Sequence, residues 1–144
     1  MVEKGASVID ENISLQEVRD LFKHDRFASE IAGCRIKEAE RGHSVVEMEI
    51  TPAHLNAQGT VMGGAIFTLG DFATAIAGNI GQDPSISTSA NIRYLTIPKG
   101  KRLIATCTAD RMGRSLGSFT VKIQDDLGNI VAIMTSTLYR LSHE

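Results

Sequence analysis

The residue of this chain best suited to chemistry is Asp71, a single carboxylate within an otherwise apolar stretch. Residues 65–77 read Ala-Ile-Phe-Thr-Leu-Gly-Asp-Phe-Ala-Thr-Ala-Ile-Ala, which is long enough for a buried helix. Burying a carboxylate costs free energy unless the group has partners or a function. Apolar neighbours would also raise the pKa of Asp71 and make it a stronger base. The alternative is a structural carboxylate that caps another element or forms an ion pair.

A glycine pair, Gly63-Gly64, stands directly before this stretch and after a polar loop at residues 54–62. The first N–H groups of a helix have no acceptor within the helix, so they are free to bind whatever docks there. Such amides can stabilise negative charge that develops on a carbonyl oxygen. The loop and the helix together predict a reaction site.

Other polar side chains near this motif allow both a functional and a structural interpretation. Asn56 could position a reacting group, or it could form an Asx-turn within the loop. For His54 we expect a loop-stabilising role through a hydrogen bond at the start of the helix. Ser87 lies in a hydroxyl-rich run, residues 85–89, in which most side chains are expected at a strand edge.

Basic residues gather at the expected strand ends and turns, where they form either an ordinary solvated rim or a phosphate-binding surface. Arg114 is the strongest candidate for a phosphate contact, because guanidinium groups bind phosphate well. Its neighbours Gly113 and Ser115 offer backbone amides that could form an anion-binding nest. The other basic residues of this group are Lys99, Lys101, Arg102 and Arg111.

The spacing of Gly63 and Asp71 predicts a site shared between two chains. Eight residues of helix rise about 12 Å, whereas a carboxylate must come within about 3 to 3.5 Å of the atom on which it acts. One chain therefore cannot easily direct both groups at one carbonyl. Two antiparallel helices across a two-fold axis would bring Gly63 of one chain near Asp71 of the other, if the two residues act together. This predicts a homodimer with two sites, which could pair further into a tetramer.

Composition excludes several classes of protein. A chain of 144 residues with a net charge of -2 predicts one domain and no nucleic-acid partner. Cys34 and Cys107 are too few for a disulfide framework, so we expect reduced thiols. No His/Cys/Asp cluster has the spacing of metal ligands, and we expect neither metal nor cofactor. No apolar stretch is long enough to span a bilayer, and no leader opens the chain. We therefore expect a cytoplasmic protein without a membrane partner.

Turn and periodicity signals divide the chain into a flexible N-terminal tail at 1–13 and a single domain at 14–144. Ser14 and Glu17 form a capping-box pattern at the start of a first helix. A second short helix is expected at 25–32, and two strands flank the turn Arg41-Gly42. The apolar helix is expected to end at Gly78 and Gly81. Four strands follow at 86–97, 102–112, 116–124 and 130–141, with spacing typical of an antiparallel meander.

A helix that is apolar on nearly all sides must be covered on most of them. One antiparallel sheet can do this by curling around the helix, which predicts an α+β fold. The face of the helix that the sheet leaves uncovered needs another surface, and this again favours a dimer.

The chain resembles the hotdog-fold acyl-CoA thioesterases of the PaaI (phenylacetate-degradation) type. The order of elements matches from Cys34 to Leu141, and the motif is His-x-Asn-x-x-Gly-x-x-His-Gly-Gly followed by an Asp on the helix. Met62 replaces the histidine that usually precedes the Gly-Gly pair, and a thioether cannot donate a hydrogen bond. The residues that carry the resemblance are His54, Asn56, Gly59, Met62, Gly63, Gly64 and Asp71.

The resemblance implies a role for each of these positions. Asp71 would be the nucleophile or the general base, and the Gly63 amide would polarise the thioester carbonyl. Asn56 would position the attacking water or the thioester, and Ser87 would hold water. The implied substrate-binding residues are His54, Met62 and Gly64 beside the reacting carbonyl and Gly113, Arg114 and Ser115 on coenzyme A.

The implied activity is hydrolysis of an acyl-CoA or aryl-acyl-CoA thioester to the free acid and coenzyme A. A non-catalytic acyl-CoA-binding module is one alternative, and Met62 is the feature that favours it. A hotdog hydratase or dehydratase is a second alternative, although such an enzyme would need a histidine where Met62 stands.

Overall fold

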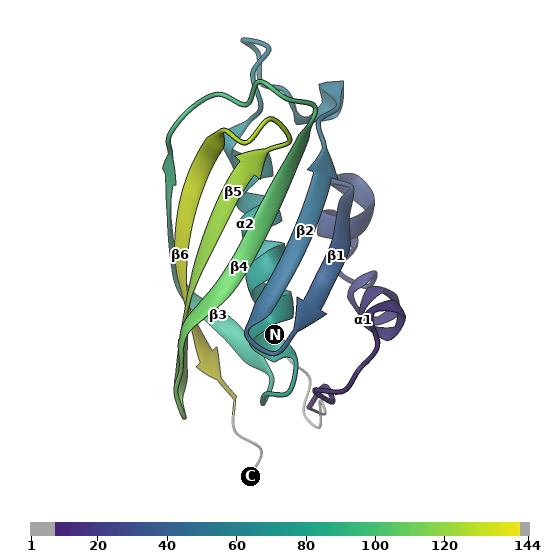
Figure 1. The fold of residues 1–144 in the computed structure, drawn as a ribbon, viewed down its shortest axis with the longest axis vertical. Coiled ribbons are helices and arrows are strands. Elements are labelled where there is room, and N and C mark those ends of the chain that lie inside the picture. Colours follow the sequence, from purple (N-terminus) through teal and green to yellow (C-terminus); the bar gives the residue numbers. More distant parts are fainter. Residues whose placement is uncertain (1–7, 142–144) are drawn as a thin grey trace.

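The computed structural model describes residues 8–141 (Figure 1). A short helix, α1 (Leu15–Phe22), and a single π-helical turn, η1 (Phe27–Ile31), precede the sheet. The long helix is α2 (Gly63–Asn79), and a 3₁₀ turn, η2 (Pro52–His54), lies before it. The strands are β1 (Cys34–Glu40), β2 (His43–Glu49), β3 (Ser85–Tyr94), β4 (Arg102–Met112), β5 (Leu116–Asp125) and β6 (Ile130–Arg140).

The six strands form one antiparallel sheet in the order β1-β2-β4-β5-β6-β3, and this sheet curls around α2 (Figure 1). The predicted α+β architecture is confirmed. The predicted meander is correct for β4, β5 and β6 but wrong for β3, which pairs with β6 in the register Asn91↔Thr135. The chain leaves β3 at Tyr94, earlier than predicted, and residues 95–101 carry it back to β4 beside β2. Strand spacing predicts where strands occur but not which strands pair.

Helix α2 packs closely on the sheet through two glycines. A Cβ atom at Gly70 would lie 2.6 Å from the sulfur of Met134, and one at Gly78 would overlap Leu138. The helix ends between Gly78 and Gly81, as predicted, but Gly78 itself does not stop it. Gly78 is a buried helical residue that lets β6 approach, and the helix continues to Asn79. Gly81, with a φ of 66°, lies in the turn beyond the helix.

The segment before the sheet is attached to the domain at several points. The capping box is confirmed, because the Glu17 amide donates to Ser14 Oγ at 3.1 Å and the Ser14 amide donates to the Glu17 carboxylate at 3.3 Å. Residues 1–7 of the predicted tail lie outside the described residues. Ile9 pairs with Ile80, and the Gly81 amide donates to the Ile9 carbonyl at 2.7 Å.

Asp125 stabilises the end of the sheet where the β3–β4 connection returns. Its side chain is 1% exposed and accepts hydrogen bonds from the amides of Lys99, Gly100, Leu127 and Asn129 and from the Asn129 side chain, at 2.9 to 3.2 Å. Burial alone would raise the pKa of Asp125. The hydrogen bonds donated by Asn129, Lys99 and Gly100 outweigh burial and hold this pKa well below its usual range.

Asp125→Asn should destabilise the protein by about 2–4 kcal/mol at pH 7, because the new amide would face N–H groups that need an acceptor. Since the pKa of Asp125 is lowered on folding, the ionised carboxylate contributes its stability above the unfolded pKa of about 4 and loses it as pH falls. The difference from wild type should therefore shrink in acid. Denaturant unfolding at pH 7 and pH 3, with Glu38→Gln as an exposed control, checks both points. Equal stabilities at pH 7 would contradict the assignment.

Candidate active site

The loop before α2 is organised by Asn56, whose side chain is exposed and bonded within the loop. Its carbonyl oxygen accepts from the amides of Gln58 and Thr60 at 3.0 and 3.1 Å, and its NH₂ group donates to the Thr60 hydroxyl at 3.0 Å. This arrangement is the Asx-turn considered from the sequence. In the single chain, Asn56 thus shapes the loop that leads to the Gly-Gly pair.

His54 connects this loop to η1. Its side chain is buried, its Nδ1 accepts from the Thr51 amide at 3.0 Å, and its Nε2 lies 2.7 Å from the carbonyl oxygen of Ala32. With Nδ1 as the acceptor, Nε2 carries the proton and donates to Ala32. His54 has the loop-stabilising contacts expected from the sequence, and it anchors the loop to the segment that flanks α2.

The start of α2 offers two unused amides beside a tyrosine. Met62 is the N-cap, so the N–H groups of Gly63 and Gly64 have no acceptor within the helix. The Tyr94 hydroxyl donates to the Gly63 carbonyl at 3.0 Å, and a Cβ atom at Gly63 would lie 3.0 Å from the Tyr94 ring. Sequence reasoning missed Tyr94, because an aromatic residue near a strand end carries no signal for this contact.

Asp71 is half-buried on the face of α2 that the sheet leaves uncovered. It lies in a cavity of about 400 Å³, and no described residue forms a hydrogen bond or salt bridge with its carboxylate. Burial raises the pKa of Asp71, and the negative charge of Asp25 raises it further. The cavity is lined by Asp25, Arg26, Phe27, Ala28, Phe67, Thr68, Asp71, Phe72 and Ala75.

A second cavity of about 250 Å³ adjoins the first along α2 and is more apolar. Phe27 and Thr68 line both cavities. The two cavities therefore form one groove, which runs along the helix from Met62 to Asp71. Met62 and Phe27 are 55% and 65% exposed. This second cavity is lined by Phe27, Ile31, Ala32, Ala53, His54, Met62, Gly64, Ala65 and Thr68.

The single chain does not bring all the predicted site residues together. The turn Gly113–Ser115 is bonded to Arg140 at the end of β6, since the Arg140 amide donates to the Ser115 carbonyl at 2.8 Å and Arg140 Nε donates to the Gly113 carbonyl at 3.0 Å. Ser87, on β3, is exposed and pairs with Leu138 of β6. Leu138 packs on Gly78, so both groups lie toward the C-terminal end of α2, away from Gly63 (Figure 1).

Within residues 8–141, no group of three His, Cys, Asp or Glu side chains is arranged to hold a metal ion. The helices of this same range are all too short or too polar to cross a membrane. Cys34 and Cys107 are buried free thiols.

Comparison with known proteins identifies a matching family, related sequences and similar solved structures. The Thioesterase superfamily model matches residues 58–132. A putative esterase of Archaeoglobus fulgidus is 27% identical over 132 residues, which cover 90% of this chain and 85% of that protein. Acyl-coenzyme A thioesterase PaaI of Escherichia coli is 26% identical over 127 residues, which cover 88% and 90%. A hypothetical thioesterase from Streptococcus pneumoniae, solved with coenzyme A, has a TM-score of 0.77 and 25% identity, covering 85% of this chain and 98% of that one.

Asp71→Asn should stabilise the folded protein at neutral pH. Because the pKa of Asp71 is raised on folding, its contribution to stability is present below the unfolded pKa of about 4 and is lost as pH rises through the folded pKa. A neutral side chain of the same shape removes that loss, and we expect the Tm at pH 7 to rise by about 2–4 °C. Thermal unfolding at pH 7 and pH 3.5, beside the exposed control Asp20→Asn, measures this. A lower Tm at pH 7 would be inconsistent with an unpartnered carboxylate.

Proposed function

Because this chain belongs to the thioesterase superfamily and is a thioester hydrolase with the hotdog fold of PaaI-type enzymes, we propose that it hydrolyses acyl-CoA thioesters with Asp71 as the reacting carboxylate. The observation that carries this proposal is the half-buried Asp71, which has no hydrogen-bond partner among the described residues and lies on the helix whose N-terminus presents the free amides of Gly63 and Gly64. Among the relatives, one is named an acyl-CoA thioesterase and another was solved with coenzyme A.

In this mechanism the thioester carbonyl oxygen accepts a hydrogen bond from the Gly63 amide, which stabilises the negative charge of the tetrahedral intermediate. Asp71 takes a proton from a water molecule whose oxygen attacks the carbonyl carbon. Alternatively, Asp71 attacks directly and the resulting anhydride is hydrolysed by water. In both routes the carbon–sulfur bond breaks and coenzyme A leaves as a thiolate that is then protonated.

The site requires two chains in this proposal. Gly63 and Asp71 lie on one continuous helix, about 12 Å apart along its axis. Strand β3 is an edge strand, and most of its residues are exposed. Two copies paired antiparallel along β3 would extend the sheet and set two α2 helices side by side in opposite directions. Gly63 of one copy would then approach Asp71 of the other.

The same arrangement gives roles to the residues at the other end of α2. Ser87 and the turn Gly113–Ser115 of one copy would approach the Gly63 end of its partner. There Ser87 would hold the attacking water, and Arg114 would contact the phosphates of coenzyme A, for which a guanidinium group is well suited.

The apolar cavity beside Gly64 is suited to bind an apolar acyl group of the substrate, either aromatic or aliphatic. Phe27, Ile31 and Met62 present large exposed apolar surfaces there. Met62, in the position where the related motif has histidine, adds apolar contact area but no proton donor. This substitution would change substrate preference and rate while leaving the Gly63 amide in place.

Thiol release from a panel of aryl and aliphatic acyl-CoAs tests the activity. We expect release by the wild type and a loss of about 100-fold or more in kcat for Asp71→Ala and Asp71→Asn. Asp20→Asn, on the exposed face of α1, should release thiol at the wild-type rate. Equal release by all variants would remove Asp71 from the mechanism. Binding of acyl-CoA without release by the wild type would indicate a binding module.

Complementation tests whether the site spans two chains. One inactive chain carries Asp71→Ala. The other carries Gly63→Pro, which removes the amide N–H, together with Tyr94→Ala, which makes room for the proline ring. Proline is tolerated at the first position of a helix. In a mixed dimer, one of the two sites keeps Gly63 from the first chain and Asp71 from the second, so mixed dimers isolated through two different tags should have about half the activity of the matched parent dimer.

The matched parent dimer contains one wild-type chain and one Tyr94→Ala chain. Both kinds of dimer are coexpressed and purified through two different tags, one on each chain, so that only mixed dimers are measured. Activity in the mixture, where each inactive variant alone has none, supports a shared site. A mixture that forms mixed dimers but stays inactive would place both groups within one chain.

A further inference from the structure

The cavity around Asp71 contains a second carboxylate, which the proposed mechanism does not use. Asp25 lies between α1 and η1 and lines the same cavity of about 400 Å³. Its side chain remains exposed on one side, so it forms part of the open rim, whereas Asp71 lies on the half-buried face of α2. Two acidic groups that are 46 residues apart in the sequence thus share one space.

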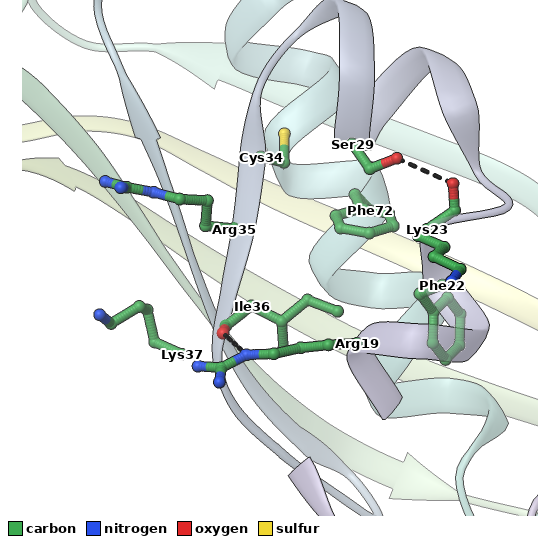
Figure 2. A pocket seen from close by; sticks show the side chains of 9 residues that line it. All are labelled: Arg19, Phe22, Lys23, Ser29, Cys34, Arg35, Ile36, Lys37 and Phe72. Atoms are coloured by element: carbon green, nitrogen blue, oxygen red, sulfur yellow. Dashed lines mark hydrogen bonds between the residues drawn. The ribbon is translucent and has the colours of Figure 1, made fainter. Parts of the chain in front are cut away.

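The backbone around Asp25 is held in place by several hydrogen bonds. The Asp25 amide donates to the Phe22 carbonyl at 3.0 Å, and the Ser29 amide and hydroxyl donate to the Asp25 carbonyl at 3.0 and 2.9 Å. The Ser29 hydroxyl also lies 3.0 Å from the Lys23 carbonyl, as Figure 2 shows. The position of Asp25 is therefore determined by the fold and not by a free loop.

This segment is also packed against α2 next to Asp71. The rings of Phe22 and Phe72 meet edge to face, with centroids 6.1 Å apart, and both side chains are buried. Phe72 directly follows Asp71 in α2. The same contact thus links the end of α1, three residues before Asp25, to the helical turn that carries Asp71.

Two of the cationic side chains near this cavity, Arg26 and Arg19, form hydrogen bonds elsewhere. Arg26 lines the cavity, but its guanidinium group donates to Glu30 at 3.2 to 3.3 Å. Arg19 and Lys23 line a separate cavity that touches the other side of Phe72, where Arg19 Nε donates to the Ile36 carbonyl (Figure 2). None of these groups forms a described ion pair with Asp71 or Asp25.

Other titratable groups lie near Asp25 but not in the cavity. His24 and Asp10 line the next cavity together with Asp25. Burial raises the pKa of Asp25, and the positive charge of His24 lowers it. Apart from the two acids and Arg26, the groups that face Asp71 are apolar or hydroxyl side chains of α2 and of residues 27–28.

We propose that Asp25 is a positioning residue of the Asp71 site, in which its carboxylate controls the protonation state of Asp71 across the shared cavity. This inference rests on the proposed role of Asp71 as the reacting group. Like charges that line one cavity repel each other, so ionised Asp25 favours the protonated form of Asp71 and makes its carboxylate a stronger base. Substrate in the groove would exclude water and strengthen the coupling.

The decisive variant is Asp25→Asn, which keeps the shape of the side chain and removes its charge. Without the repulsion, Asp71 should ionise more readily, so the acidic limb of kcat/KM against pH should move to lower pH. At the acidic end of the profile the rate should rise about twofold or more relative to the plateau of the same variant. Asp25→Glu keeps the charge and should retain the wild-type profile, and Asp20→Asn serves as the control on α1.

A second measurement does not depend on activity. Carbon-13 NMR of the Asp71 carboxyl group gives its titration midpoint directly, and Asp25→Asn should lower this midpoint relative to the wild type and Asp20→Asn. If the midpoint moves in a protein that releases no thiol, the coupling stands and the proposed function fails. An unchanged midpoint, or a loss of kcat/KM that is uniform across pH, would overturn the role of Asp25.

Discussion

The structure depends on the burial of one helix that is apolar on nearly every side. Nine of the residues in α2 are buried, and the sheet can curl closely around the helix only because Gly70 and Gly78 leave room for Met134 and Leu138. A single sheet covers most of the helix but leaves one strip. That strip contains Phe67, Asp71 and Ala75, and it forms the wall of the candidate active site.

The same packing keeps the predicted site residues apart within one chain. A straight helix separates the Gly63 amide from Asp71, and the sheet places Ser87 and the turn Gly113–Ser115 near the opposite end of the helix. The order β5-β6-β3 also leaves β3 as an exposed edge next to this region. The features that a single chain leaves incomplete are therefore the ones that two-fold pairing would complete.

Two aspartates of this chain show how local surroundings determine the behaviour of a carboxylate. Asp125 and Asp71 are both withdrawn from water, yet their pKa values are shifted in opposite directions. Asp125 is surrounded by N–H donors that favour its ionised form, so it stabilises the fold. Asp71 has no described hydrogen-bond donor and shares its cavity with Asp25, so its protonated form is favoured and its pKa is raised.

The sequence by itself determined the features that depend on neighbouring residues. The capping box of Ser14 and Glu17, the Asx-turn of Asn56 and the apolar helix around Asp71 were all predictable, because the interacting groups lie within a few residues of each other. The spacing of Gly63 and Asp71 similarly gives their separation along the helix, because helical rise converts residue number into distance, and the two-chain site inferred from it stays a prediction.

The tertiary structure alone decided which distant segments meet. Gly78 was predicted to stop the helix, but it is a helical residue on which β6 packs. The pairing of β3 with β6 follows from the path of the whole chain. The contacts of Tyr94 with Gly63, and of Asp25 with the Asp71 cavity, join residues 31 and 46 positions apart. No local pattern encodes such contacts, because they depend on how the sheet and the flanking helices pack around α2.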